Sequence, residues 1–81
     1  MNAAFLFGGL QMSDSCEVII DRLIEQRHRQ KMTQKELAQA ANLTQSVIAR
    51  LESKKTVPQL DTLLKVSAAL NCSLKVVSIT E

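Results

Sequence analysis

Apolar residues recur at helical spacing in four stretches of the chain, which predicts four helices. The first runs from Asp14 to about Gln30, and the fourth from about Gln59 to Leu70. The second and third each begin with Thr-Gln, at Thr33 and Thr44. The residues expected to face the core are Cys16, Ile19, Ile20, Leu23 and Ile24, then Leu37, Ala38 and Ala41, then Val47, Ile48 and Leu51, and finally Leu60, Leu63, Leu64, Ser67 and Leu70.

Capping residues predict where the two middle helices begin and end. Thr33 and Glu36 have the spacing of a capping box, in which each side chain bonds a free backbone N–H of the other residue. Asn42 tolerates the left-handed conformation of a helix end, and Thr44 is the next cap. Since only Asn42-Leu43 separates the two elements, the helices cannot stack end to end. They are expected to cross at an angle.

The last segment, residues 73–80 ("SLKVVSIT"), lacks helical periodicity and is β-branched, so it predicts a single strand. Leu74 and Val76 are expected to point to one side, and Val77 and Ile79 to the other. A lone strand leaves its backbone unpaired. We therefore expect these four residues to dimerise the protein, by antiparallel pairing with a second copy about a twofold axis. The alternative is a frayed tail that packs on the fourth helix.

Composition and charge narrow the class of protein. The 81 residues suffice for one small domain, and only 2% are aromatic, so Leu, Ile, Val and Ala must fill the core. From Arg27 to Lys55 there are seven basic and two acidic residues, whereas the rest of the chain is net acidic. A basic middle predicts a polyanion as partner. A helix-dipole pattern is the alternative for the charges of the first helix, but it leaves Arg50 and Lys54 unexplained.

Several classes of function lack the residues they need. Cys16 and Cys72 lie far apart, and with the single His28 they form no metal-ligand pattern, so they are expected to be reduced in a cytoplasmic protein. No catalytic set and no phosphate-binding glycine loop is present, so we expect neither an enzyme nor a cofactor. Residues 1–12 are apolar but too short to span a bilayer. They are expected to be a flexible extension, or to result from a start codon upstream of Met12, and no membrane partner is expected.

The third predicted helix has a polar face suited to DNA bases. Gln45, Ser46, Ala49 and Arg50 lie opposite its apolar stripe. Glutamine can pair with adenine, arginine with guanine and serine with either, and an alanine methyl can touch thymine. We therefore expect these four residues to read bases. An ordinary polar surface is the alternative for this helix taken alone.

Groups that attract phosphate flank this face. Lys35 lies at the start of the second helix, where N–H groups and the helix dipole favour anions, and Lys55 follows the third helix. A base-reading helix between two phosphate contacts is the docking arrangement of a helix-turn-helix. The residues expected to bind phosphate are Gln34, Lys35, Thr44, Lys54, Lys55 and Thr56.

The stretch "MTQKELAQAANLTQSVIARLESKKTVPQLDTLLKVSAAL" closely resembles the Cro/repressor-like helix-turn-helix family, over about residues 23–70. The resemblance implies a mainly α fold, with a four-helix lambda-repressor-like DNA-binding domain. It also implies base reading by residues matching Gln45, Ser46 and Arg50, and a structural pair between Arg27 and Glu52.

Two departures from the family pattern bear on the turns. Asn42 stands where a turn glycine is usual, and Ser53-Lys54 stands where Asn-Gly is common. The resemblance also implies that the residue matching Gln34 anchors a phosphate.

Four helices followed directly by a strand resemble the HipB- and HigA-like antitoxins of toxin–antitoxin operons. That resemblance implies a repressor that binds a palindromic double-stranded DNA operator as a homodimer, represses its own operon and neutralises a toxin protein. A stand-alone phage-type or metabolic regulator is the alternative. The expected divisions are an extension over residues 1–12, the DNA-binding domain over 13–71 and the dimerisation strand over 72–81.

Overall fold

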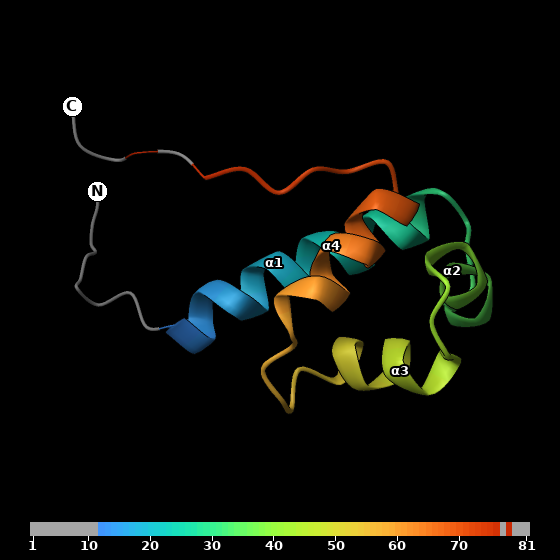
Figure 1. Ribbon diagram of the computed structural model, residues 1–81, viewed down its shortest axis with the longest axis horizontal. Helices are drawn as coiled ribbons and strands as arrows, with labels where there is room; N and C mark the ends of the chain where they lie inside the picture. The colour runs from blue at the N-terminus through green and yellow to red at the C-terminus, as the bar shows by residue number, and fades with distance from the viewer. Residues whose placement is uncertain (1–11, 77, 79–81) are drawn as a thin grey trace.

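The computed structural model describes residues 12–76 and 78, and these contain the four expected helices (Figure 1). They are α1 (Met12–Arg29), α2 (Gln34–Ala41), α3 (Gln45–Ser53) and α4 (Leu60–Ala69). The first helix begins two residues before the expected Asp14. The remainder of the expected N-terminal extension lies outside the described residues.

Local hydrogen bonds define the junction between α2 and α3. The capping box is present: Thr33 N–H donates to Glu36 Oε1 over 2.8 Å, and Glu36 N–H donates to Thr33 Oγ1 over 3.0 Å. Asn42 ends α2 in the left-handed conformation, with φ 59°. Thr44 then caps α3 by accepting the N–H of Val47 at 3.2 Å. The two helices cross steeply, as Figure 1 shows.

Four helix ends turn through the left-handed region without glycine. Lys31, Asn42, Lys54 and Asn71 have φ values of 59°, 59°, 61° and 60°. This conformation brings Cβ too close to the carbonyl oxygen and costs about 1–2 kcal/mol for most residues, with asparagine among the more tolerant. The two lysines are therefore strained positions that the surrounding structure holds in place.

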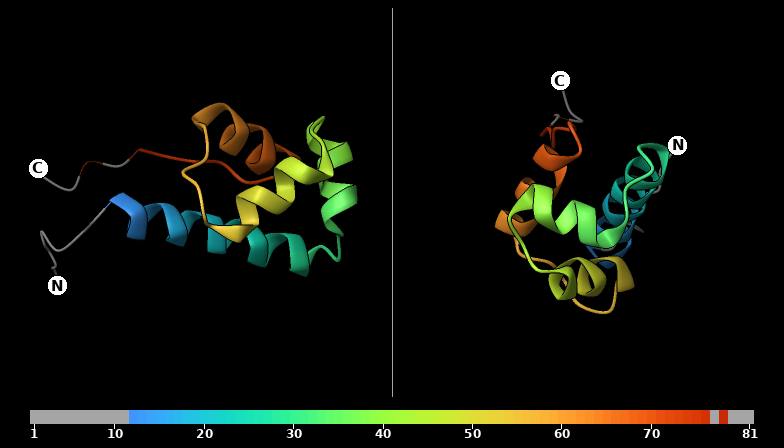
Figure 2. Two further views of the ribbon diagram at one scale, coloured as in Figure 1. Left: turned by 90° about the horizontal axis from the view of Figure 1, so that it is seen from below. Right: turned by 90° about the vertical axis from the view of Figure 1, so that its right-hand side faces the viewer.

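The core forms where all four helices meet. Ile20, Leu37, Ile48, Val66 and Leu70 are at most 2% exposed. The predicted inward faces of the first three helices are confirmed, since their members are buried or half-buried. α2 packs against α3 and α4, and α3 also packs on α1 (Figure 2).

The predicted inward face of α4 was partly wrong. Leu60 and Leu64 are 66% and 47% exposed, whereas Val66, which was not in the predicted set, is fully buried. The buried side is centred on Leu63, Val66 and Leu70. Leu64 is turned away because successive helical residues differ by about 100°.

The described part of the C-terminal tail, residues 72–76 and 78, is extended and contains no strand. Cys72 and Leu74 are half-buried and pack against the core, and residues 72–74 line a groove of about 400 Å³ together with α1. Val76 is fully exposed. Strand pairing needs a second chain, so it stays a prediction. Val77 and Ile79 lie outside the described residues.

A buried ion pair ties the end of α1 to the end of α3. Arg27 is 9% exposed, and its Nε and Nη2 donate to the two carboxylate oxygens of Glu52 over 2.7 and 2.9 Å. Its Nη1 donates to the carbonyl oxygen of Met32, in the turn before α2, over 2.7 Å. The pair implied by the family resemblance is therefore present, and Arg27 is structural.

Replacing Arg27 with alanine is expected to reduce the free energy of unfolding by about 3–5 kcal/mol, because it leaves the buried Glu52 carboxylate without a positive charge and with Gln34 as its remaining side-chain donor. Urea unfolding followed by circular dichroism measures the change. Arg29→Ala is the matched control. Its pair with Glu25 is exposed and 3.5 Å long, so the expected loss is at most about 0.5 kcal/mol. Similar losses in the two variants would contradict the structural role of Arg27.

Candidate nucleic-acid interface

The outward side of α3 presents the four residues that were expected to read bases. Gln45, Ser46, Ala49 and Arg50 are all exposed, while Ile48 and Leu51 on the opposite side are buried. Packing of that apolar side against α1 and α2 fixes the rotation of the helix about its axis. The structure therefore brings two long hydrogen-bonding side chains and two small ones together on one accessible helical surface.

The N-terminal end of α3 combines a cap with free donors. The Thr44 hydroxyl oxygen accepts the Val47 N–H, and its own hydrogen can still donate to another oxygen. The first N–H groups of the helix, on Gln45 and Ser46, have no acceptor within the helix. Together with the helix dipole, they favour an anion at this exposed end.

The first residues of α2 differ in their availability. Lys35 is exposed, but Gln34 is half-buried and donates from Nε2 to Glu52 Oε1 over 3.0 Å. Gln34 thus joins the ion pair of Arg27. Its amide keeps a second N–H and its oxygen, so it can still contact a phosphate while it holds α2 to α3.

The residues after α3 are also not equivalent. Lys55 and Thr56 are exposed, and neither side chain has a carboxylate partner among residues 12–76 and 78. Lys54, by contrast, donates from Nζ to Asp21 Oδ1 of α1 over 2.6 Å. This hydrogen bond, and the negative charges of Asp21 and Glu17, raise the pKa of Lys54 above its usual value, so the side chain stays charged.

Asp21 was missed as part of this surface by sequence reasoning. It belongs to the charges of the first helix, for which a helix-dipole pattern was the alternative explanation. Its contact with Lys54 joins residues 33 positions apart, and no local pattern reports such a contact. Only the packing of α3 across α1 brings the two side chains together (Figure 2).

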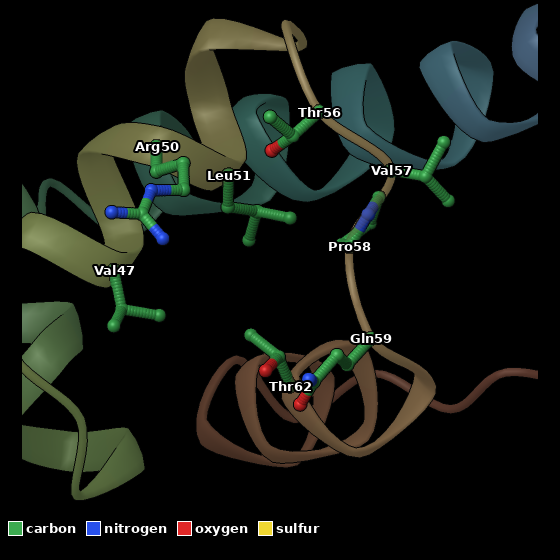
Figure 3. A pocket seen from close by; sticks show the side chains of 8 residues that line it. All are labelled: Val47, Arg50, Leu51, Thr56, Val57, Pro58, Gln59 and Thr62. Carbon is green, nitrogen blue, oxygen red and sulfur yellow. The ribbon is translucent and has the colours of Figure 1, made fainter.

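A cavity of about 410 Å³ lies beside the exposed face of α3 (Figure 3). Three elements build it: α3, the loop that follows it, and the start of α4. The lining residues are Val47, Arg50, Leu51, Thr56, Val57, Pro58, Gln59 and Thr62. Arg50 therefore stands between the outward face of α3 and a concave surface with hydroxyl and amide groups.

Neither a metal-binding group nor a membrane-spanning helix occurs among the described residues. Within residues 12–76 and 78, no group of histidine, cysteine and carboxylate side chains is arranged to hold a metal ion. Cys16 and Cys72 are free thiols and half-buried. None of the helices described here combines the length and apolar character that a bilayer span requires.

Comparison with known proteins adds three similarities. A family model described as helix-turn-helix matches residues 23–77. An uncharacterized HTH-type transcriptional regulator from Haemophilus influenzae is 41% identical over 59 residues, covering 73% of this chain and 60% of that protein. This chain therefore aligns with about three fifths of the length of that relative. A chain of the Toxin-Antitoxin module from Streptococcus pneumoniae has a TM-score of 0.75 and 43% identity, covering 95% of this chain and 87% of that chain.

Substitution of Thr44 by valine should reduce the free energy of unfolding by about 1 kcal/mol, because the Val47 N–H loses its side-chain acceptor. Thr44→Ser keeps the hydroxyl oxygen and should change the free energy of unfolding by only a few tenths of a kcal/mol. Thermal denaturation of the two variants beside the wild type measures both effects. A serine variant as unstable as the valine variant would rule out the cap as the cause.

Proposed function

The chain belongs to the helix-turn-helix family, and we propose that it is a sequence-specific DNA-binding transcriptional repressor that acts as a homodimer. The observation that carries this proposal is the exposed face of α3, with Gln45, Ser46, Ala49 and Arg50 accessible together beside basic residues. In this role α3 enters the major groove, and α2 crosses the DNA backbone.

Base reading is assigned to the side chains of α3. Gln45 and Arg50 can each form two hydrogen bonds to one base, to adenine and guanine respectively. Ser46 adds a single hydrogen bond, and Ala49 an apolar contact to a thymine methyl group. Arg50 is in addition the residue that connects this face to the cavity beside α4.

Phosphate binding is assigned to the ends of the two helices. Gln34 and Lys35 at the start of α2, with Thr44 at the start of α3, contact one stretch of backbone through side-chain donors and helix N–H groups. Lys55 and Thr56 contact the backbone at the other end of α3, and Lys54 contacts it there when its ammonium leaves Asp21. Such contacts set the position of the protein on DNA and carry no sequence information themselves.

Dimerisation is assigned to the C-terminal segment. Val76 is a fully exposed apolar residue in an extended tail, which supports pairing with a second copy. Leu74, Val77 and Ile79 complete the proposed strand, of which Leu74 already packs on the core. A symmetric dimer of this kind binds a palindromic operator with half-sites about 34–36 Å apart.

We further propose that the repressor is an antitoxin that represses its own operon and neutralises a partner toxin. The support is the likeness, over 95% of this chain, to a chain of a toxin–antitoxin module. The alternative is a stand-alone phage-type or metabolic regulator with no toxin partner, and the likeness to an HTH-type transcriptional regulator is compatible with both. DNA binding is common to the two.

Selection of the purified protein against a randomised duplex library, at moderate salt, tests the DNA-binding function. We expect enrichment of a palindrome whose two half-sites are one helical turn apart. Enrichment of a single half-site would support base reading by α3 and contradict the symmetric dimer. Absence of any enriched sequence would contradict sequence-specific binding.

Arg50→Ala should weaken binding to the selected operator by about 1–3 kcal/mol and relax the preference at one base position. Lys55→Ala is the matched control for loss of positive charge. It should weaken binding to all duplexes alike and reduce the slope of affinity against salt by about 1. Repeating the library selection and a salt titration with both variants distinguishes these effects. An unchanged base preference in Arg50→Ala would remove Arg50 from the reading set.

The antitoxin role is tested by co-expression of the protein with the product of the gene next to its own. Inhibition of growth by that product alone, relieved by this protein, together with co-purification of the pair, is the expected result. A neighbouring product that neither inhibits growth nor co-purifies would favour the stand-alone regulator.

A further inference from the structure

The C-terminal end of α3 carries a lysine whose charge is already matched within the molecule. Lys54 ends the helix in the left-handed conformation, with its N–H directed to the carbonyl oxygen of Leu51 at 3.3 Å. Its ammonium reaches across to α1 and donates to Asp21 Oδ1 over 2.6 Å. Figure 2 shows this end of α3 close to the middle of α1, the helix that contains Asp21.

A second acid acts on this pair. Glu17, one helical turn before Asp21, adds a second negative charge that acts on Lys54 without a hydrogen bond. Both acids are exposed, and the side chains of Lys54 and Asp21 are 33% and 57% exposed. The pair is therefore accessible from outside the protein, and exposed pairs of this kind break easily.

A lysine held in this way does not act on DNA as a free lysine does. An ammonium that binds a phosphate releases a condensed counterion, and this release supplies much of the affinity. An ammonium bound to a carboxylate forms a neutral pair, and the carboxylate would lie close to the same phosphate. Contact with DNA thus requires Lys54 either to leave Asp21 or to bring a negative charge to the DNA backbone.

We propose that Asp21 is a positioning residue that holds the Lys54 ammonium on α1 and thereby lowers the affinity of the DNA-binding surface for all sequences. This inference rests on the proposed function and specifies how strongly that function depends on salt. Asp21 sets the number of phosphate contacts and leaves the base-reading side chains of α3 unaffected.

The test compares the wild type with Asp21→Asn, Lys54→Gln and the double variant. Each full-length protein is titrated against the selected operator and against an unrelated duplex of equal length, over a series of KCl concentrations. Glu17→Gln is the matched control, since it removes the same charge from the same helix but leaves the hydrogen bond of Lys54 intact. Circular dichroism melting verifies that each variant is folded.

We expect Asp21→Asn to bind both duplexes roughly three- to tenfold more tightly near physiological salt and to steepen the salt slope by about 0.9, the value of one added phosphate contact. Glu17→Gln should have a much smaller effect. The double variant should have the same slope of affinity against salt as Lys54→Gln alone.

Three results would overturn the inference: an unchanged slope in Asp21→Asn, an equal change in Glu17→Gln, or the full change in the absence of Lys54. Each of these leaves DNA binding by the wild type intact. A wild-type protein that binds neither duplex would instead refute the proposed function, and this inference with it.

Discussion

The buried pair between Arg27 and Glu52 is the constraint on which the arrangement of α2 and α3 depends. One guanidinium contacts the last turn of α3 and the turn before α2 from its place near the end of α1. Gln34 brings the first residue of α2 to the same carboxylate. An unpaired buried charge costs far more free energy than a lost surface contact. Loss of one of these groups is therefore expected to disrupt the contacts of the others. The arrangement that exposes the polar side chains of α3 therefore depends on contacts of Glu52, in the last turn of that helix.

The features that sequence could predict are those with local causes. The capping box of Thr33 and Glu36 and the inward stripes of α2 and α3 depend on residues a few positions apart, and all are present. The prediction for the inward face of α4 was partly wrong, because the helix has more than one stripe of apolar residues and only tertiary packing selects which one is buried. The role of Arg27 came from the family resemblance, since the charge pattern alone placed it among residues facing DNA. The contact of Lys54 with Asp21 had no signal in the sequence.

Pairing within the protein redistributes the charge of the basic segment. Of its seven basic residues, three have carboxylate partners among the described residues, namely Arg27, Arg29 and Lys54. These three partners differ in what they do: Glu52 supports the fold, Glu25 forms a weak exposed pair, and Asp21 lies beside the proposed phosphate contacts. The positive field of the segment is consequently smaller than a count of basic residues indicates. The four that have no carboxylate partner among the described residues are Lys31, Lys35, Arg50 and Lys55.

Beyond Gly9 the chain contains no glycine, so each left-handed helix end in the described part of the chain is formed by lysine or asparagine. A glycine at position 54, common in the family, would relieve the backbone but would remove the ammonium that Asp21 holds. Replacing Lys54 with glycine would therefore lower the backbone strain and also lower the positive charge of the protein. Position 54 thus offers a choice between a less strained helix end and an additional positive charge, and either choice leaves the exposed face of α3 unchanged.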